Sequence, residues 1–512
     1  SRLTIEYHPN DSLFFRFAYD KTIDDSNAKG GYRLNQSVFT MQQPHNNLYD
    51  SDISLPVTNK VETSGISFTI DWILSKQFNI KSVTSHREGD TLTAIDFDNT
   101  VLKTADVPAV FDDEQFTQEF QISYGGNGIN AVGGAYYYTG DACGLFDLQA
   151  EMLAQALSLP GYTQQVSGCT DTESYSGYGQ STIKLSNQWS MTIGGRYTQD
   201  TKSADVSNFT FFQTVYPGES ESGSVTPVNP DNYFTNEETW SHFSPRVGAE
   251  YQYSEDLMYY FSYANGFKSG GFNPRGDLGK DPEAALPFDP EIVDTFEFGF
   301  KSEPTDDLRV NATYFFSDYS DMQVTVQRAV ENSFAAKVVN AGAAEIQGLE
   351  LESTYAASDN LTLNLGVGYI DAEFIDFIDV DPDSGEFVNR ANEKGISNTP
   401  DWSINLGANY ILVADIGDIV FTANAAYRGE TQIFEDPSAL DQEGYTLVNM
   451  GVNFYHSDGH WSASLQGKNV FNEQVIIAGY NFPLPNGLLG EDAMIGYYNA
   501  PSTLAFTIKY EF

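Results

Sequence analysis

The chain has 512 residues, of which 41% are hydrophobic and 14% aromatic, and 71 acidic residues against 26 Lys and Arg give a formal charge of −45. This balance argues against nucleic-acid binding, which needs basic surface, while the apolar and aromatic content argues against disorder. The sequence contains no run of about 18 apolar residues and predicts no transmembrane helix, but a membrane β-strand needs only about ten residues with alternate apolar positions.

Alternation of apolar and polar residues with a period of two dominates the chain and predicts β-strands throughout. The clearest examples are the segments 189–197, 308–316, 361–369, 402–410 and 504–512. One face of each segment is apolar, and the other is small, polar or charged. Because a soluble β-sandwich shows the same alternation, the connections between the strands have to decide the fold class.

Short turns and long loops alternate strictly along the chain. The short turns are predicted at 8–11, 74–77, 125–128, 186–188, 254–256, 303–307, 357–360, 412–417 and 457–460. The long loops are predicted at 21–61, 88–113, 140–174, 203–238, 269–290, 329–343, 374–400, 431–443 and 482–497. This order predicts about 19 strands with all turns at one end, as in outer-membrane barrels, whose periplasmic turns are short and extracellular loops long. A β-propeller would instead repeat at about 40–45 residues.

One long loop contains the two cysteines of the chain, Cys143 and Cys169. In an oxidising compartment two cysteines most simply form one disulfide, and metal ligation by two cysteines alone is disfavoured. Between them, residues 146–159 are predicted to form a short amphipathic helix that ends at Pro160 and Gly161. A disulfide closing this loop would contribute roughly 3 kcal/mol of stability.

An acidic stretch at 379–386, with the sequence DVDPDSGE, resembles a calcium loop. The EF-hand pattern requires Gly at its sixth position and Glu at its twelfth, where this chain has Ser384 and Arg390. An ordinary acidic outer loop is therefore the favoured interpretation, and Ca²⁺ on the acidic outer loops stays open. The six histidines are scattered, and no catalytic triad, zinc signature or phosphate-binding loop is present in the sequence. We therefore predict no catalytic residues, no metal site and no resident cofactor.

All five tryptophans fall at predicted strand ends. Trp72, Trp189 and Trp461 lie beside short turns, whereas Trp240 and Trp402 lie near long loops. Aromatic girdles at the two membrane interfaces place tryptophans in this way, although chance would also account for five positions. We predict an interface girdle in contact with outer-membrane lipid.

Strand direction carries a further expectation. If the long loops are extracellular, the last strand ends in the periplasm, whereas the strand at 2–7 precedes a short turn and would start outside the cell. Complete single-chain bacterial barrels have an even number of strands. The sequence therefore predicts an N-terminal part, with an odd number of strands, beyond these residues.

Five segments resemble the barrel of TonB-dependent outer-membrane receptors. They are 243–251 (FSPRVGAEY), 259–273 (YYFSYANGFKSGGFN), 340–352 (NAGAAEIQGLELE), 467–472 (GKNVFN) and 498–501 (YNAP). The resemblance implies an all-β fold, a transmembrane antiparallel β-barrel of 22 strands with about 19 of them in this sequence. It also implies that residues 1–512 form the barrel domain, and that a plug domain, an energy-coupling box and about three strands precede it.

The function implied by this resemblance is active uptake of a scarce ligand across the bacterial outer membrane, without covalent chemistry. The usual ligand is a ferric siderophore, and the implied partner is a TonB-type energy-transducing protein that acts on the plug. Vitamin, haem or oligosaccharide uptake in the same fold is one alternative. A passive porin-like channel, usually with 16–18 strands, and a soluble secreted enzyme or adhesin are alternatives of other classes.

The last strand ends in Tyr510, Glu511 and Phe512. Its alternating apolar residues and final aromatic side chain look like the signal recognised by the barrel-assembly machinery, with Tyr510 and Phe512 as the signal residues. An ordinary final strand is the alternative interpretation.

Overall fold

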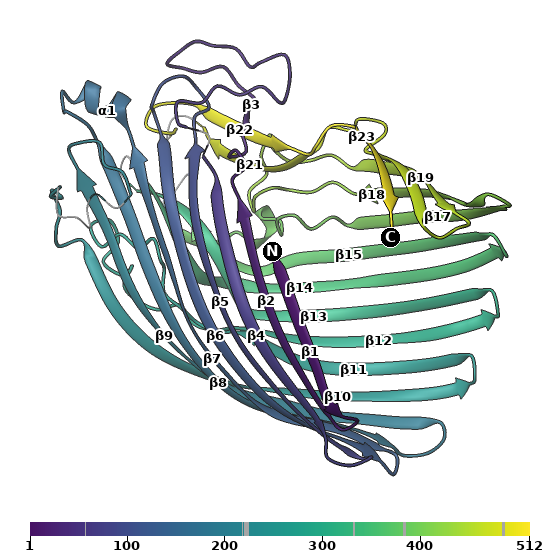
Figure 1. Cartoon of the computed structure of the whole chain (residues 1–512). Coiled ribbons are helices and arrows are strands. Elements are labelled where there is room, and N and C mark those ends of the chain that lie inside the picture. Colours follow the sequence, from purple (N-terminus) through teal and green to yellow (C-terminus); the bar gives the residue numbers. More distant parts are fainter. Residues whose placement is uncertain (57, 218, 220–224, 331–332, 382–385, 484–486) are drawn as a thin grey trace.

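The computed structural model describes residues 1–512 except 57, 218, 220–224, 331–332, 382–385 and 484–486 (Figure 1). Antiparallel strands make up most of the described chain, and its helical elements are α1 (Glu151–Ala156) and the 3-10 helix η1 (Ala391–Glu393). Across the described ranges, none of the helices has the length and apolar character that crossing a membrane requires.

In the part of the chain that the structure describes, twenty strands form one large sheet and three form a second. The large sheet contains β1 (Arg2–Asn10), β2 (Leu13–Asp24), β4 (Lys60–Ile73), β5 (Phe78–Asp96), β6 (Asp106–Gly126), β7 (Ile129–Gln149), β8 (Thr163–Lys184), β9 (Trp189–Phe211), β10 (Tyr233–Ser254), β11 (Leu257–Lys268), β12 (Glu291–Thr305), β13 (Leu308–Val330), β14 (Ser333–Ser358), β15 (Leu361–Val380), β16 (Phe387–Asn389), β17 (Trp402–Ala414), β18 (Gly417–Arg428), β19 (Tyr445–His456), β20 (Trp461–Lys468) and β23 (Thr503–Tyr510). The second sheet contains β3 (Tyr32–Arg33), β21 (Ile476–Phe482) and β22 (Ala493–Tyr498).

The large sheet is a curved wall in which strands that follow one another pair antiparallel (Figure 1). Within the described residues, β16 pairs only with the loop-side end of β15, and the other strands of the large sheet form a meander of nineteen. This number agrees with the strand count predicted from the alternation of turns and loops. Among the described strands, β1 pairs with β2 alone and β23 with β20 alone.

Each of the nine short turns lies within or next to its predicted position, but several predicted loops are too long. Strands β5 to β10 continue well into the predicted loops 88–113, 140–174 and 203–238. Strands β13 and β14 likewise continue through most of 329–343, where residues 331–332 lie outside the described part. Beyond the membrane both faces of a strand meet water, so the period-two pattern fades while the backbone ladder continues.

The helix predicted at 146–159 is also shorter than expected, because α1 covers only Glu151–Ala156. Residues 146–149 belong to β7 instead, where they pair with residues 163–166 of β8. The ladder that contains the two cysteines continues into this segment, and its hydrogen bonds take the backbone groups that a helix would have used.

The middle of the wall and its loop end differ in how their apolar side chains are packed. Along the wall, large apolar side chains at alternate positions are exposed, among them Phe298 at 58% and Leu349 at 56%. Their neighbours in sequence, Glu297 and Glu350, lie on the opposite face. An exposed apolar outer face with a polar inner face is typical of a strand wall in lipid. The buried hydrophobic clusters of the described chain, by contrast, lie at the loop-side strand ends.

Candidate functional site

The first and last long connections of the chain meet at the loop end of the wall. They meet in the second sheet, which we call the clasp and define as β3, β22 and β21. Tyr32 pairs with Gly496 and Arg33 with Ile495. A Cβ atom added at Gly31 would lie 2.3 Å from Cγ2 of Ile495, so the close approach of the two segments requires glycine at this position.

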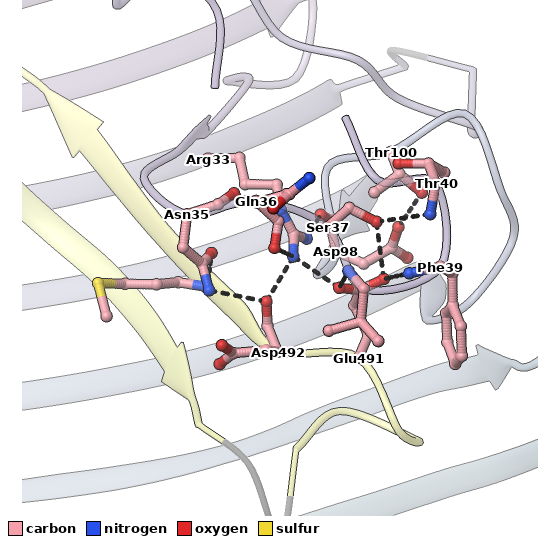
Figure 2. A network of polar contacts seen from close by, with 12 residues as sticks. Arg33, Asn35, Gln36, Ser37, Phe39, Thr40, Asp98, Thr100, Glu491 and Asp492 are labelled. Carbon is pink, nitrogen blue, oxygen red and sulfur yellow. Dashed lines mark hydrogen bonds and ion pairs between the residues drawn. The ribbon is translucent and has the colours of Figure 1, made fainter. Parts of the chain in front are cut away.

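A buried ion pair joins the two halves of the clasp. Nη2 of Arg33 lies 2.7 Å from Oε1 of Glu491, and Figure 2 shows the two side chains pointing toward each other. The carboxylate of Glu491, which is fully buried, also accepts hydrogen bonds from the Ser37 hydroxyl and from the Val38 and Phe39 amides. It is therefore well satisfied despite its burial.

The remaining donors of Arg33 go to backbone carbonyls. Nη1 donates to the carbonyl of Asp98 at 2.6 Å, Nε donates to that of Asn35 at 3.0 Å, and Nη2 also donates to Asp492. Arg33 thereby connects the clasp to the loop between β5 and β6, which contains Asp98 (Figure 2).

Three buried carboxylates, which we call the acidic triad, lie in this β5–β6 connection. Asp96 ends β5, Asp106 begins β6 and the two are ladder partners, while Asp98 follows in the loop. Their exposed fractions are 7%, 0% and 0%, and one carboxylate oxygen from each lies within 4.8 Å of the other two. Carboxylate oxygens in this arrangement are suited to hold a hard cation.

Backbone amides and hydroxyl groups hold the triad in place. Asp96 accepts from the Asp98 and Asn99 amides, and Asp98 accepts from the Ala105 amide. The Ser54 hydroxyl donates to Oδ1 of Asp106 at 2.6 Å. These contacts bring together residues from two separate connections, 25–59 and 97–105.

The triad is electrostatically unusual because it is buried outside the membrane-spanning part of the wall. Burial raises the pKa of Asp98 to about 7, with a further contribution from the charge of Asp96. Burial likewise raises the pKa values of Asp96 and Asp106 to about 6. The neighbouring Lys103 pairs with Glu151 at 3.3 Å rather than with the triad.

Another buried carboxylate stands apart from the triad. Asp147, at the loop end of β7, is fully buried and accepts a hydrogen bond from Gln165 at 2.7 Å. Burial raises its pKa to about 7.

An aromatic patch adjoins the triad, and we define it as Phe97, Tyr480, Phe482 and Tyr497. The ring of Tyr480 lies 4.7 Å from that of Phe97 and 6.0 Å from that of Tyr497. Burial raises the pKa of Tyr480, and the nearby positive charge of Arg275 opposes this shift. Arg275 is exposed, and its guanidinium lies over the ring of Phe146 at 5.3 Å. Half-buried rings with an exposed guanidinium form a surface suited to an aromatic, anionic ligand.

The predicted disulfide is confirmed. Cys143 and Cys169 are bonded, and their Cα atoms are 4.1 Å apart. They are opposite one another in the β7–β8 ladder, so the disulfide links two strands that are already paired.

Four of the five predicted girdle residues lie at or next to strand ends, but the predicted strand-end position of Trp240 is wrong, because β10 begins at Tyr233 inside the predicted loop 203–238. Trp72, Trp189, Trp402 and Trp461 are about half exposed, at 46–48%. Trp240 is less exposed and packs 6.2 Å from the buried ring of Phe272 at the loop end. A position at the membrane interface stays a prediction for all five.

The predicted assembly-signal residues belong to the final strand and its end. Tyr510 is the last residue of β23, and its ring lies 4.7 Å from that of Trp461 and 5.0 Å from that of Phe512. Recognition of these aromatic side chains by an assembly machinery stays a prediction.

The acidic stretch at 379–386 is only partly within the described residues, because 382–385 are outside them. Asp379 lies 3.0 Å from Nζ of Lys394, whose side chain is 4% exposed. A basic side chain thus already balances the charge of the first acid of this stretch.

Sequence reasoning missed both the clasp and the triad. The sequence DFDNT at 96–100 carries alternating acids that could have drawn attention to this loop. Its partners could not have been found in this way, because Ser54 and Glu491 come from connections far away in sequence.

Comparison with known proteins identifies the family to which this fold belongs. The family model described as "TonB dependent receptor-like, beta-barrel" matches residues 3–470. The ferric-pyoverdine M114 receptor PbuA of Pseudomonas sp. (strain M114) is 22% identical over 347 residues, which are 66% of this chain and 36% of that receptor. The chain thus spans little more than a third of the length of this relative.

Solved structures show the same architecture. The ferric yersiniabactin uptake receptor FyuA from Yersinia pestis has a TM-score of 0.79 at 17% identity, over 100% of this chain and 70% of that one. The siderophore receptor PiuA from Acinetobacter baumannii has a TM-score of 0.71 at 13% identity, over 100% of this chain and 74% of that one. At these identities the likeness shows the fold.

Proposed function

The chain belongs to the TonB-dependent receptor family, whose members are β-barrels of the bacterial outer membrane, and on this basis we propose that it serves in TonB-dependent uptake of a ferric siderophore. The family match over residues 3–470 carries this proposal. Support for the ligand class comes from the relatives, because PbuA is a ferric-pyoverdine receptor and FyuA a ferric yersiniabactin uptake receptor. The family consists of transport receptors rather than enzymes.

In this proposal the wall spans the outer membrane, and the ordered loop end meets the ligand. The aromatic patch offers ring faces for stacking, and the exposed guanidinium of Arg275 offers fixed donors for carboxylate or phenolate oxygens. The polar inner face of the wall, which includes Glu297 and Glu350, lines the route of the ligand across the membrane. Stacking and charge-assisted hydrogen bonds are contacts that a ligand can make and later release, so the barrel performs no covalent step.

The proposal includes two protein partners. A TonB-type energy-transducing protein supplies the work of transport, and the barrel-assembly machinery inserts the barrel by recognising Tyr510 and Phe512. The alternative is a passive porin-like channel, in which permeation follows the concentration gradient and needs no energised partner.

Radioactive iron uptake tests the proposal. Cells that produce the protein, and a matched deletion strain, are starved of iron and supplied with ⁵⁵Fe complexed to pyoverdine, yersiniabactin or a catecholate siderophore. We expect the protein to increase uptake of at least one complex several-fold, and a protonophore to abolish the increase. Uptake that persists with the protonophore would support the passive channel, and equal uptake of all complexes in both strains would contradict the siderophore assignment.

Two variants sharpen this experiment. Arg275→Ala removes the exposed guanidinium beside the aromatic patch and is expected to weaken cell-surface binding of the transported complex about tenfold or more, as a charged hydrogen bond contributes about 1.5–3 kcal/mol. Arg309→Ala is the matched control, because Arg309 is also exposed but pairs with Glu303 at a turn on the opposite end of the wall. Equal binding by both variants would place the ligand elsewhere than at the patch.

A further inference from the structure

We propose that Asp96, Asp98 and Asp106 bind one divalent cation with the properties of Ca²⁺, and that this cation fastens the β5–β6 connection to the clasp. The site is distinct from the aromatic patch, where we place the transported ligand, and it does not depend on the identity of that ligand.

The geometry of the triad suits a single ion. Ca²⁺ binds oxygen ligands at about 2.3–2.6 Å, so two ligands on opposite sides of it are about 4.6–5.2 Å apart. One carboxylate oxygen from each residue of the triad lies within 4.8 Å of the other two, so three ligands fit around one ion. All three are carboxylates, which favours a hard cation over zinc or copper, whose sites draw on imidazole and thiolate ligands.

A buried carboxylate oxygen of the triad that has no hydrogen-bond donor among the described residues is independent evidence for a cation. Oδ2 of Asp106 is buried and accepts no hydrogen bond within the described part of the chain, although Oδ1 of the same group is bound by the Ser54 hydroxyl. Asp106 as a whole is fully buried, so water does not reach this oxygen from the surface. A buried acceptor without a donor destabilises the folded state, and a cation at this position would remove that penalty.

The charge balance points the same way. Among the described residues, no Lys or Arg side chain forms an ion pair with the triad. Lys103 is engaged with Glu151, and Arg33 with Glu491, while the contact of Arg33 with Asp98 is to the backbone carbonyl. Buried carboxylates that share a site and lack a basic partner need a compensating cation to remain ionised.

The cation would act on the clasp through Asp98. The carboxylate of this residue faces the other two acids of the triad, and its backbone carbonyl accepts from Arg33 at 2.6 Å. Fixing Asp98 therefore also fixes the acceptor that positions the arginine of the clasp. Through Ser54, which donates to Asp106, the same ion would order the connection between β2 and β4.

Calcium titration of the full-length receptor in detergent tests the proposal. After treatment with EDTA, CaCl₂ is titrated in by calorimetry, and hydrogen exchange of peptides covering 94–108 is compared with and without calcium. We expect one saturable site and exchange in this segment at least tenfold slower with calcium. The exchange readout needs no variant, so it remains informative if a substitution impairs folding.

Three variants locate the site. Asp98→Asn and Asp106→Asn keep the side-chain shape but remove a charged ligand, and each is expected to weaken calcium binding at least tenfold. Asp147→Asn is the matched control, because it replaces a carboxylate that is equally buried but outside the triad. Unchanged binding in both triad variants would overturn the proposal. Calcium-dependent protection that appears at 379–386, with none at 94–108, would overturn it as well and move the site to the other acidic loop.

Discussion

Removing either side chain of the Arg33–Glu491 pair should open the clasp without disturbing the wall. In the variant Arg33→Met, the fully buried carboxylate of Glu491 loses the cation 2.7 Å away and keeps only neutral donors. In Glu491→Gln, the guanidinium of Arg33 stays buried against backbone carbonyls without a counter-charge. Breaking a buried ion pair from one side costs about 3–5 kcal/mol, because the remaining charge is left uncompensated.

The clasp also offers a direct way to measure this cost. A loss of about 3–5 kcal/mol raises local opening by roughly 10² to 10³·⁵-fold, since 1.4 kcal/mol corresponds to a factor of ten. Hydrogen exchange followed by mass spectrometry should show faster exchange in peptides covering 30–36 and 488–498, whose amides include that of Leu34, bonded to the Met494 carbonyl. Peptides from β12 and β13 should exchange at the wild-type rate.

The control for this experiment is Arg309→Met. Arg309 and Glu303 form an ion pair at 2.7 Å, but their side chains are 65% and 56% exposed, so water replaces the lost partner. The expected cost is below about 1 kcal/mol. The double variant Arg33→Met/Glu491→Gln should cost less than the sum of the two single variants. If the single variants change exchange in the clasp by no more than Arg309→Met does, the reasoning about the buried pair is wrong.

Four further predictions concern other parts of the molecule. Burial raises the pKa of Asp147 to about 7, so the folded state keeps a proton that the unfolded state releases between about pH 4 and 7, and stability falls as pH rises through this range. Asp147→Asn should therefore unfold at a higher temperature than wild type at pH 8 but not at pH 4. Equal shifts at both pH values would argue against ionisation of Asp147 as the cause. Replacing both Cys143 and Cys169 by Ser should cost about 3 kcal/mol and speed thermolysin cleavage within 150–162, whereas unchanged cleavage would mean that the ladder alone holds this loop. In a variant that retains Trp189 as its one tryptophan, lipids brominated near the headgroup should quench the tryptophan fluorescence most strongly. Strongest quenching by lipids brominated at the ends of the acyl chains would contradict an interface position. Phe512→Ala should slow insertion by purified assembly machinery into liposomes, and an unchanged rate would leave the last residue as an ordinary strand end.

The wall could be predicted from the sequence because the membrane imposes two chemically different faces on each strand. Apolar and polar residues therefore alternate with a period of two in segments such as 308–316 and 402–410, and this alternation ends at the turns. The prediction failed where the constraint ends. Segments such as 163–174 continue the ladder of β8, but their mostly small and polar residues form no continuous apolar face and therefore predict a loop.

Part of the candidate site could likewise be predicted from the sequence, and part could not. The disulfide could be predicted because the chain has only two cysteines, so the pairing required no geometry. The triad and the clasp depend on contacts between distant segments, and neither Glu491 nor Ser54 lies in a local pattern that identifies its partner. Only the folded wall, by bringing the ends of its strands to one rim, places these residues together.

The clasp also has a consequence for the order in which the molecule folds. Wall strands mostly pair with a neighbour in the chain, so the meander can grow hairpin by hairpin with little loss of chain entropy at each step. Arg33 and Glu491 are 458 residues apart, and their contact closes a loop that includes nearly the whole meander. Protection of the clasp amides should therefore arise last during refolding, which makes the clasp a marker that the strands between its two halves have been assembled.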